Sequence, residues 1–237
     1  MSLPIDFAPA AVLFDMDGLM IESERALLQC WRESSQHLGL TLDDALWLSF
    51  VGLSDRVCHD MLRERLAEEQ VAALLHELQL RYDAHVEAGL PLKAGVIELL
   101  QLLDERGIPR AVATSTRRDR ALQKLERCGL LPHFHDVITG SDVAHAKPAP
   151  DIYLLAAQRL GVEPARCVVL EDSGPGVRAA LAAGMTPIQV PDLVHPDEAT
   201  RSLGHRVVES LVHARALIEP VLPLAGGRTA QDSRSPA

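Results

Sequence analysis

Aromatic residues, cysteines and long apolar runs are all scarce in this sequence. Aromatics are 3% of the 237 residues, so Leu, Val, Ile and Ala must supply most of the core. A disulfide framework needs a shorter, denser set of cysteines, so we expect reduced core thiols at the four scattered positions, Cys30, Cys58, Cys128 and Cys167. No segment reaches the roughly 18 apolar residues of a membrane-spanning helix.

Positive charge is also sparse. The formal net charge is −10, and no dense stripe of Lys and Arg occurs. This disfavours nucleic-acid backbones and anionic membranes as main partners. The first ten residues contain neither Lys nor Arg and lack the long apolar segment of a signal peptide. We therefore expect a cytoplasmic protein with no nucleic-acid or membrane partner, and by default a monomer.

Short apolar runs alternate with helical patterns along most of the chain. Val96, Leu99, Leu100 and Leu103 have the i, i+3, i+4, i+7 spacing of a helix with one buried face, and Tyr153, Leu154, Ala157 and Leu160 repeat it. Glycines at 107 and 161 are placed to end these helices. The apolar runs predict buried strands at residues 10–14, 109–113, 135–138, 167–170 and 186–190, with a weaker one near 206–208. The alternation predicts an α/β fold, a Rossmann-like parallel sheet covered on both faces.

One interval interrupts this alternation. About 70 residues after the first strand carry only helical signals. Three apolar stripes occur there: Leu27, Leu28, Trp31 and Leu38; Val57, Met61, Leu62 and Leu66; and Val71, Leu74, Leu75, Leu78 and Tyr82. Such helices need a mutual core, so we predict an inserted all-helical cap domain with hinges near residues 20–23 and 87–93. The expected domains are a core (1–20 and 94–222), a cap (21–93) and a disordered tail (223–237).

The segment F-D-M-D-G, residues 14–18, directly follows the first predicted strand. The strand should bring Asp15 to the carboxyl edge of the sheet, where open α/β sheets bind ligands. Asp17 can share that side of the opening, and Gly18 permits a tight turn. Two carboxylates this close both stay ionised only beside a cation, for which magnesium is the natural choice. Alone, D-x-D-G would also fit an ordinary surface turn.

Two further polar segments follow predicted strands. Thr114 and Ser115 end the second strand, where their hydroxyls and nearby N–H groups can face an anion, although such residues also simply cap helices. Lys147 precedes two prolines that stiffen the approach to a helix. A rigidly held ammonium offsets the charge of a phosphoryl group, although a lone lysine more often lies on the solvated surface.

The fourth segment, E-D-S-G-P-G at 171–176, brings a second acidic pair, Glu171 and Asp172, to the sheet edge. Its glycines allow close approach of the backbone, and Pro175 suits the start of a helix. An acidic helix cap is the alternative for this segment alone. Two carboxylate pairs, a hydroxyl and a lysine at the ends of four strands predict a single shared site.

Together the four segments resemble the haloacid dehalogenase superfamily of phosphatases. They match its D-x-D-G, threonine, K-P-x-P-D and E-D-S-x-x-G motifs in order, over roughly residues 11–190. Residues 15–24 and 171–185 are similar to the branch that contains β-phosphoglucomutase and sugar-phosphate phosphatases, and the helical insert matches that branch's mobile cap. The combined set of motifs is highly specific, whereas no single motif is.

The resemblance implies an aspartyl-phosphate mechanism. Asp15 attacks phosphorus and becomes phosphorylated, while Asp17 protonates the leaving oxygen and later activates water. Thr114 holds a phosphoryl oxygen, and Lys147 balances negative charge. The implied activity is Mg²⁺-dependent hydrolysis of a small phosphorylated metabolite such as a sugar phosphate.

The resemblance also implies the binding residues. Phosphate contacts are expected from Gly18 and Ser115 as well as from Thr114 and Lys147. Magnesium is expected at Asp15, at the backbone carbonyl of Asp17 and at Asp172, with Glu171 in support. Substrate choice is expected to depend on cap residues near Glu24, Trp47 and 52–56.

Some positions depart from the pattern. Glu22 stands where the family often has Asp. Leu27 stands where β-phosphoglucomutases have a histidine that assists transfer to sugar hydroxyls, and Ser54 is followed by Asp55 rather than by the mutase arginine. These differences weaken a phosphomutase alternative. A phosphonate-cleaving enzyme would need a cap lysine, and the insert has none before Lys93. A non-catalytic binding protein would ordinarily have lost an acidic or lysine position, and none is missing.

Overall fold

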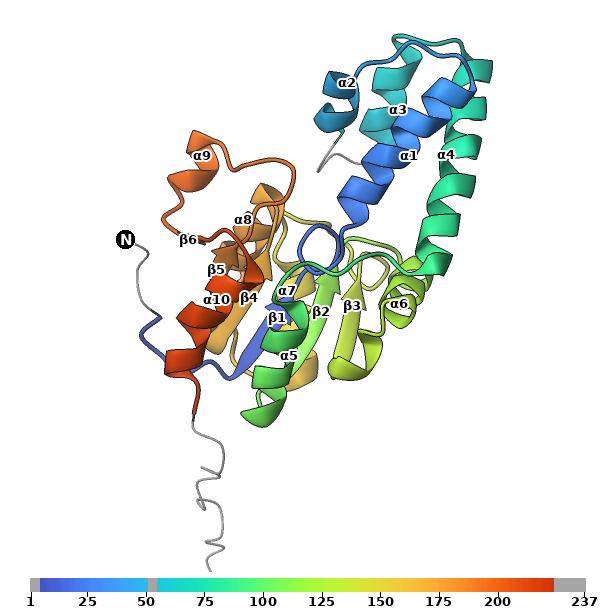
Figure 1. The fold of residues 1–237 in the computed structure, drawn as a ribbon. Coiled ribbons are helices and arrows are strands. Elements are labelled where there is room, and N and C mark those ends of the chain that lie inside the picture. The colour runs from blue at the N-terminus through green and yellow to red at the C-terminus, as the bar shows by residue number, and fades with distance from the viewer. Residues whose placement is uncertain (1–4, 51–54, 224–237) are drawn as a thin grey trace, which may run out of the picture.

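The computed structural model describes residues 5–50 and 55–223 (Figure 1). Six parallel strands form one sheet in the order β3-β2-β1-β4-β5-β6. The strands are β1 (Ala11–Phe14), β2 (Arg110–Thr114), β3 (Asp136–Thr139), β4 (Cys167–Glu171), β5 (Thr186–Gln189) and β6 (Arg206–Val207). Every predicted strand is therefore confirmed to within one residue at each end.

Helices cover both faces of the sheet. Because successive strand residues point to opposite faces, Val12 and Phe14 pack with α5 (Val96–Glu105), α6 (Arg118–Arg127) and α10 (Leu211–Ile218). Ala11 and Leu13 pack on the other side with α7 (Asp151–Leu160) and α8 (Gly174–Ala182). The remaining helical segments are the short α9 (Glu198–Arg201) and the single 3₁₀ turns Leu131–His133, Pro164–Arg166 and Glu219–Val221.

The predicted buried face is right for α5 and partly wrong for α7. All four predicted residues of α5 are buried, whereas Leu154 of α7 is exposed. The buried residues of α7 are Ile152, Tyr153, Ala156 and Ala157, a face rotated by about one residue from the prediction. Gly107 and Gly161 follow the two helix ends with φ of 62° and 67°, the left-handed conformation that favours glycine.

The insert folds into four helices with a core of their own. They are α1 (Ser23–His37), α2 (Asp44–Ser49), α3 (Asp55–Arg63) and α4 (Glu68–Ala88). The sequence predicted three; α2 was missed because it has only six residues, too few for a periodic pattern. In α3 the predicted Val57 is exposed, and the neighbouring Cys58 is buried instead. Leu38, just past α1, is also exposed.

The two connections between sheet and insert lie side by side. Ile21 bridges to Leu92 in antiparallel fashion, and the N–H of Glu22 donates to the carbonyl of Pro91 at 2.9 Å. The insert leaves the sheet from the carboxyl end of β1 and stands beyond that edge (Figure 1). The predicted hinge segments coincide with these connections, and the division into domains there stays a prediction.

Within the described residues, no helix is both long and apolar enough to cross a membrane. The predicted disordered tail lies outside them except for Pro223, whose carbonyl accepts a hydrogen bond from Arg106 at 3.1 Å.

Candidate active site

Asp15 and Lys147 meet at the carboxyl edge of the sheet. Asp15 follows β1, and its N–H donates to the carbonyl of Leu170 in β4 at 3.0 Å, which holds it between the two central strands. The Lys147 ammonium donates to Asp15 Oδ1 at 2.5 Å, to Glu171 Oε1 at 2.6 Å and to the carbonyl of Ala113 at 2.9 Å. The buried Lys147 ammonium is thus fixed by acceptors in β2 and β4 and by one just after β1.

Glu171 is saturated with hydrogen-bond donors. Besides Lys147, it accepts from the Tyr153 hydroxyl at 2.6 Å and from the N–H and hydroxyl of Ser173 at 3.1 and 2.9 Å. Burial opposes its ionisation, but Lys147, Tyr153 and Ser173 together hold the pKa of Glu171 below its usual value. Burial likewise opposes the charge on Lys147, yet Asp15 and Glu171 raise its pKa well above the usual value. In this geometry Glu171 binds and supports Lys147, and its expected support of the metal stays a prediction.

Asp172 approaches the Asp15–Gly18 turn. A Cβ on Gly18 would lie 2.3 Å from Asp172 Oδ2, and Gly18 has φ 78°, so only glycine fits this position. Burial, followed by the nearby charges of Asp15 and Glu171, raises the pKa of Asp172 well above its usual value. Burial also raises the pKa of Asp15 to about 7, although Lys147 acts against it.

These two carboxylates fit a divalent cation. Among residues 5–50 and 55–223, no three His, Cys, Asp or Glu side chains gather closely enough to hold a metal by themselves. Magnesium commonly takes one or two protein carboxylates and keeps several water ligands. Asp15, Asp172 and the carbonyl of Asp17 provide such a set. A cation there would offset the burial and the nearby negative charges that raise the pKa values of both side chains.

Asp17 is bound by residues that the motifs did not single out. Lys124 of α6 donates to Oδ1 at 2.7 Å, and the Thr116 hydroxyl donates to Oδ2 at 2.6 Å. Burial works against ionisation, but Lys124, Thr116 and Ser23 lower the pKa of Asp17. The sequence carried one signal for Lys124: it lies between the apolar Ala121 and Leu125 on the buried face of α6.

The phosphate-binding residues expected after β2 lie beside this cluster. Thr114 is buried at the end of the strand, next to Ala113, whose carbonyl binds Lys147. Its hydroxyl accepts from the N–H of Thr116 at 3.2 Å, while Ser115 is exposed. A Cβ on Gly140 would lie 2.4 Å from the Ser115 carbonyl, so Gly140 keeps the β2 and β3 loops close.

The cap residues expected to affect substrate choice separate into different environments. Glu24 reaches the site: its Cγ lies 3.6 Å from the Cβ position of Gly18, and burial, followed by the charge of Asp17, raises its pKa to about 7. Trp47 instead stacks on Trp31 inside the cap core, with ring centroids 5.0 Å apart. Residues 52–54 and the side chains of 55 and 56 lie outside the described part of the chain.

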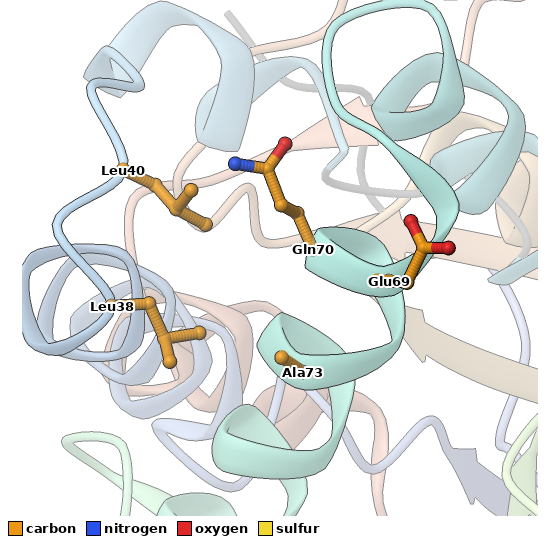
Figure 2. Close-up of a pocket in the computed structure, with 5 residues that line it drawn as sticks. All are labelled: Leu38, Leu40, Glu69, Gln70 and Ala73. Atoms are coloured by element: carbon orange, nitrogen blue, oxygen red, sulfur yellow. The ribbon is translucent and has the colours of Figure 1, made fainter.

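A cavity of about 200 Å³ occurs elsewhere in the cap, between the end of α1 and the start of α4 (Figure 2). It is lined by Leu38, Leu40, Glu69, Gln70 and Ala73. None of these residues belongs to the carboxylate and lysine cluster, and this cavity is not the candidate active site.

Comparisons with known proteins agree with this arrangement. The family model of the haloacid dehalogenase-like hydrolases matches residues 9–184. A phosphorylated carbohydrates phosphatase of Thermotoga maritima is 32% identical over 213 residues, covering 88% of this chain and 90% of the relative. A fructose-1-phosphate phosphatase of Escherichia coli is 34% identical over 187 residues, covering 76% and 96%. The crystal structure of a HAD family hydrolase from Deinococcus radiodurans, with bound phosphate and sodium, has TM-score 0.77 and 35% identity, covering 93% of this chain and 100% of that one.

The parallel sheet, the helical insert and the polar cluster at the carboxyl edge define a capped α/β enzyme. More specifically, the chain belongs to the haloacid dehalogenase-like hydrolases. The fold class and the family predicted from the four motifs are therefore confirmed.

Proposed function

We propose that this protein is a Mg²⁺-dependent phosphatase of a small phosphorylated carbohydrate, acting through a phosphorylated Asp15. One observation carries the proposal above all others. Asp15 is held by the Lys147 ammonium at 2.5 Å, beside an Asp172 carboxylate that packs into the space above Gly18. A carboxylate nucleophile, a fixed cation and a second carboxylate for a metal are the parts that phosphoryl transfer needs.

In the first step an Asp15 oxygen forms a bond to phosphorus while the bond from phosphorus to the sugar oxygen breaks. Lys147 is placed to balance negative charge on Asp15 and on the transferring group, because Glu171 and Ala113 prevent it from moving away. Thr114 and the N–H groups of its loop provide hydrogen bonds for the phosphoryl oxygens. When bound at Asp15, Asp172 and the Asp17 carbonyl, magnesium would supply charge neutralisation and orientation.

Asp17 is the proposed general acid and base. It gives a proton to the departing sugar oxygen, then accepts one from the water whose oxygen attacks the phosphorus on Asp15; this releases phosphate and restores both carboxylates. Lys124 and Thr116 favour the ionised form of Asp17, the form that activates water. The acid step requires that Asp17 first take up a proton.

The proposed substrate class rests on relatives and on one cap residue. The relatives include the two carbohydrate phosphatases described above and a hexitol phosphatase of Escherichia coli that is 32% identical over 220 residues. Glu24 offers a carboxylate near Gly18, where it can accept hydrogen bonds from a polyol. Against the mutase alternative, Leu27, at the position of the mutase histidine, packs against the apolar core of the cap.

The proposal is tested by release of phosphate from p-nitrophenyl phosphate and from a panel of sugar and polyol phosphates ranked by kcat/KM. Turnover should require Mg²⁺, stop in excess chelator and be abolished in Asp15→Asn. Full activity in that variant or in chelator would refute it. For glucose 1-phosphate, release of phosphate should exceed formation of glucose 6-phosphate; the reverse would favour a mutase.

A further inference from the structure

Lysine is rare in this chain, and each lysine is paired with acid. It occurs only at positions 93, 124 and 147, among 23 basic residues. Lys93 pairs with Asp192, Lys147 with Asp15 and Glu171, and Lys124 with Asp17. The first pair lies at the cap connections and the second in the proposed site. In the mechanism above Lys124 only favours the ionised form of Asp17, yet its side chain is almost buried, at 8% exposed.

Lys124 occupies a place where an apolar residue would pack well. Its neighbours on the inner face of α6, Ala121 and Leu125, belong to the hydrophobic core. Burying an ammonium costs free energy unless its partner is well placed, and replacing such pairs with apolar residues is often neutral or stabilising. Packing therefore does not explain a lysine here, whereas the 2.7 Å contact with Asp17 Oδ1 does.

Lys124 is itself held from the cap side. The ring centroid of Tyr82, in α4, lies 5.3 Å from its ammonium. Next to Tyr82, polar contacts join α4 to α6: Arg120 to Asp83, Gln123 to Glu87 at 2.5 Å, and Arg127 to Glu87 at 2.6 Å. With Thr116 on its other oxygen, the Asp17 carboxylate is restrained at both ends.

We propose that Lys124, backed by Tyr82, is the positioning residue that aims the Asp17 carboxylate at the leaving oxygen of the substrate. This inference rests on the proposed phosphatase function. Lys124 does not contact the reacting atoms; it fixes the plane of Asp17, and without it the carboxylate can rotate about Thr116. A small misplacement of a general acid removes much of its contribution, and that contribution depends on the leaving group.

The test compares two leaving groups in Lys124→Gln. p-Nitrophenolate leaves without being protonated, whereas a sugar alkoxide needs the proton from Asp17. Since kcat/KM covers the steps up to release of the leaving group, it should fall about tenfold or more for the best sugar phosphate of the panel. For p-nitrophenyl phosphate it should change by less than about threefold. Lys124→Arg, which keeps the positive charge, should recover part of the loss.

Arg118→Gln is the matched control, because it removes one positive charge from an exposed position of the same helix, where Arg118 pairs with Asp142 away from Tyr82. It should leave the ratio of the two kcat/KM values unchanged. An equal loss on both substrates in folded Lys124→Gln would show a merely structural role, and no loss on either would also overturn the inference. If Lys124→Gln does not fold, Tyr82→Leu, which removes the ring beside the ammonium, takes its place: a ratio lowered about twofold or more supports the inference, and an unchanged ratio overturns it.

These outcomes are separate from failure of the proposed function itself. If the wild-type protein hydrolyses neither substrate, the phosphatase proposal fails. If it hydrolyses both and Lys124→Gln leaves their ratio unchanged, only the positioning role of Lys124 fails.

Discussion

The carboxylate of Glu171 occupies the space that a side chain on Gly176 would need. A Cβ on Gly176 would lie 1.8 Å from Glu171 Oε1, the oxygen that binds Lys147. Helix α8 therefore comes this close to Glu171, and through it to Lys147, only because its third residue is glycine. Gly176 thus leaves room for the carboxylate that holds the Lys147 ammonium.

Gly176→Ala should lower both stability and kcat, because the methyl group must push Glu171, and with it Lys147, out of place. We expect a loss of about 1–3 kcal/mol in the free energy of unfolding, measured by denaturant titration, and a lower kcat on p-nitrophenyl phosphate. Gly174→Ala is the control, since its Cβ would meet only the side chains of Arg178 and Thr200, at 3.1 Å. Equal effects of the two substitutions would contradict this account.

Lys147→Met should lower both stability and kcat more than the loss of another paired lysine does. It leaves Asp15 and Glu171 as neighbouring buried carboxylates, and breaking a buried pair typically costs about 3–5 kcal/mol. The kcat on p-nitrophenyl phosphate should fall about a hundredfold or more. Lys93→Met is the comparison, because Lys93 pairs with Asp192 and Glu22 outside the cluster. The proposed role of Lys147 is wrong if kcat falls equally in both variants.

The first five strands could be located from the sequence because each contains a short run of buried residues, mostly apolar, whereas the weaker β6 is partly exposed. Helix faces were less certain. At Val57 and Leu154 the buried face is one residue away from the prediction, since neighbouring apolar residues on a helix differ by only about 100° in direction. The cavity in the cap could not be predicted either, because it depends on how α1 and α4 pack.

The candidate site likewise contains residues that the sequence could indicate and others that it could not. Asp15, Thr114, Lys147 and Asp172 could be named from the sequence because each lies at the end of a strand or in a motif, and their roles stay predictions. Lys124, Thr116 and Tyr153 were missed, since their roles arise from contacts between segments that are far apart in the sequence. The structure also gives Glu22 a role that the sequence left open: it contacts Arg25 at 2.9 Å and Lys93 at 3.3 Å, across the two cap connections.

Glu24 should make the metal-free protein less stable as pH rises. Its pKa is raised from 4.5 to about 7 in the folded protein, so between these values the folded state binds more protons than the unfolded state. Stability then falls as pH increases through this window. In chelator, the Tm of Glu24→Gln, measured by circular dichroism, should exceed that of the wild type by an amount that grows from pH 5 to pH 8. A difference in Tm that is independent of pH would contradict a raised pKa of Glu24 in the folded protein.

Magnesium should stabilise the folded protein through Asp172, and this can be measured without turnover. A ligand at about 100 times its Kd that binds only the folded state adds about 2.7 kcal/mol. Wild-type Tm should therefore rise with MgCl₂. Asp172→Asn should remove most of that rise, while its Tm in chelator should equal or exceed that of the wild type, since burial and the charges of Asp15 and Glu171 disfavour an ionised Asp172.

Asp192→Asn is the control, because Asp192 binds Lys93 at the cap connections, and its Mg²⁺-dependent rise should persist. If the rise is the same in Asp172→Asn as in the wild type, the cation binds elsewhere than at Asp172.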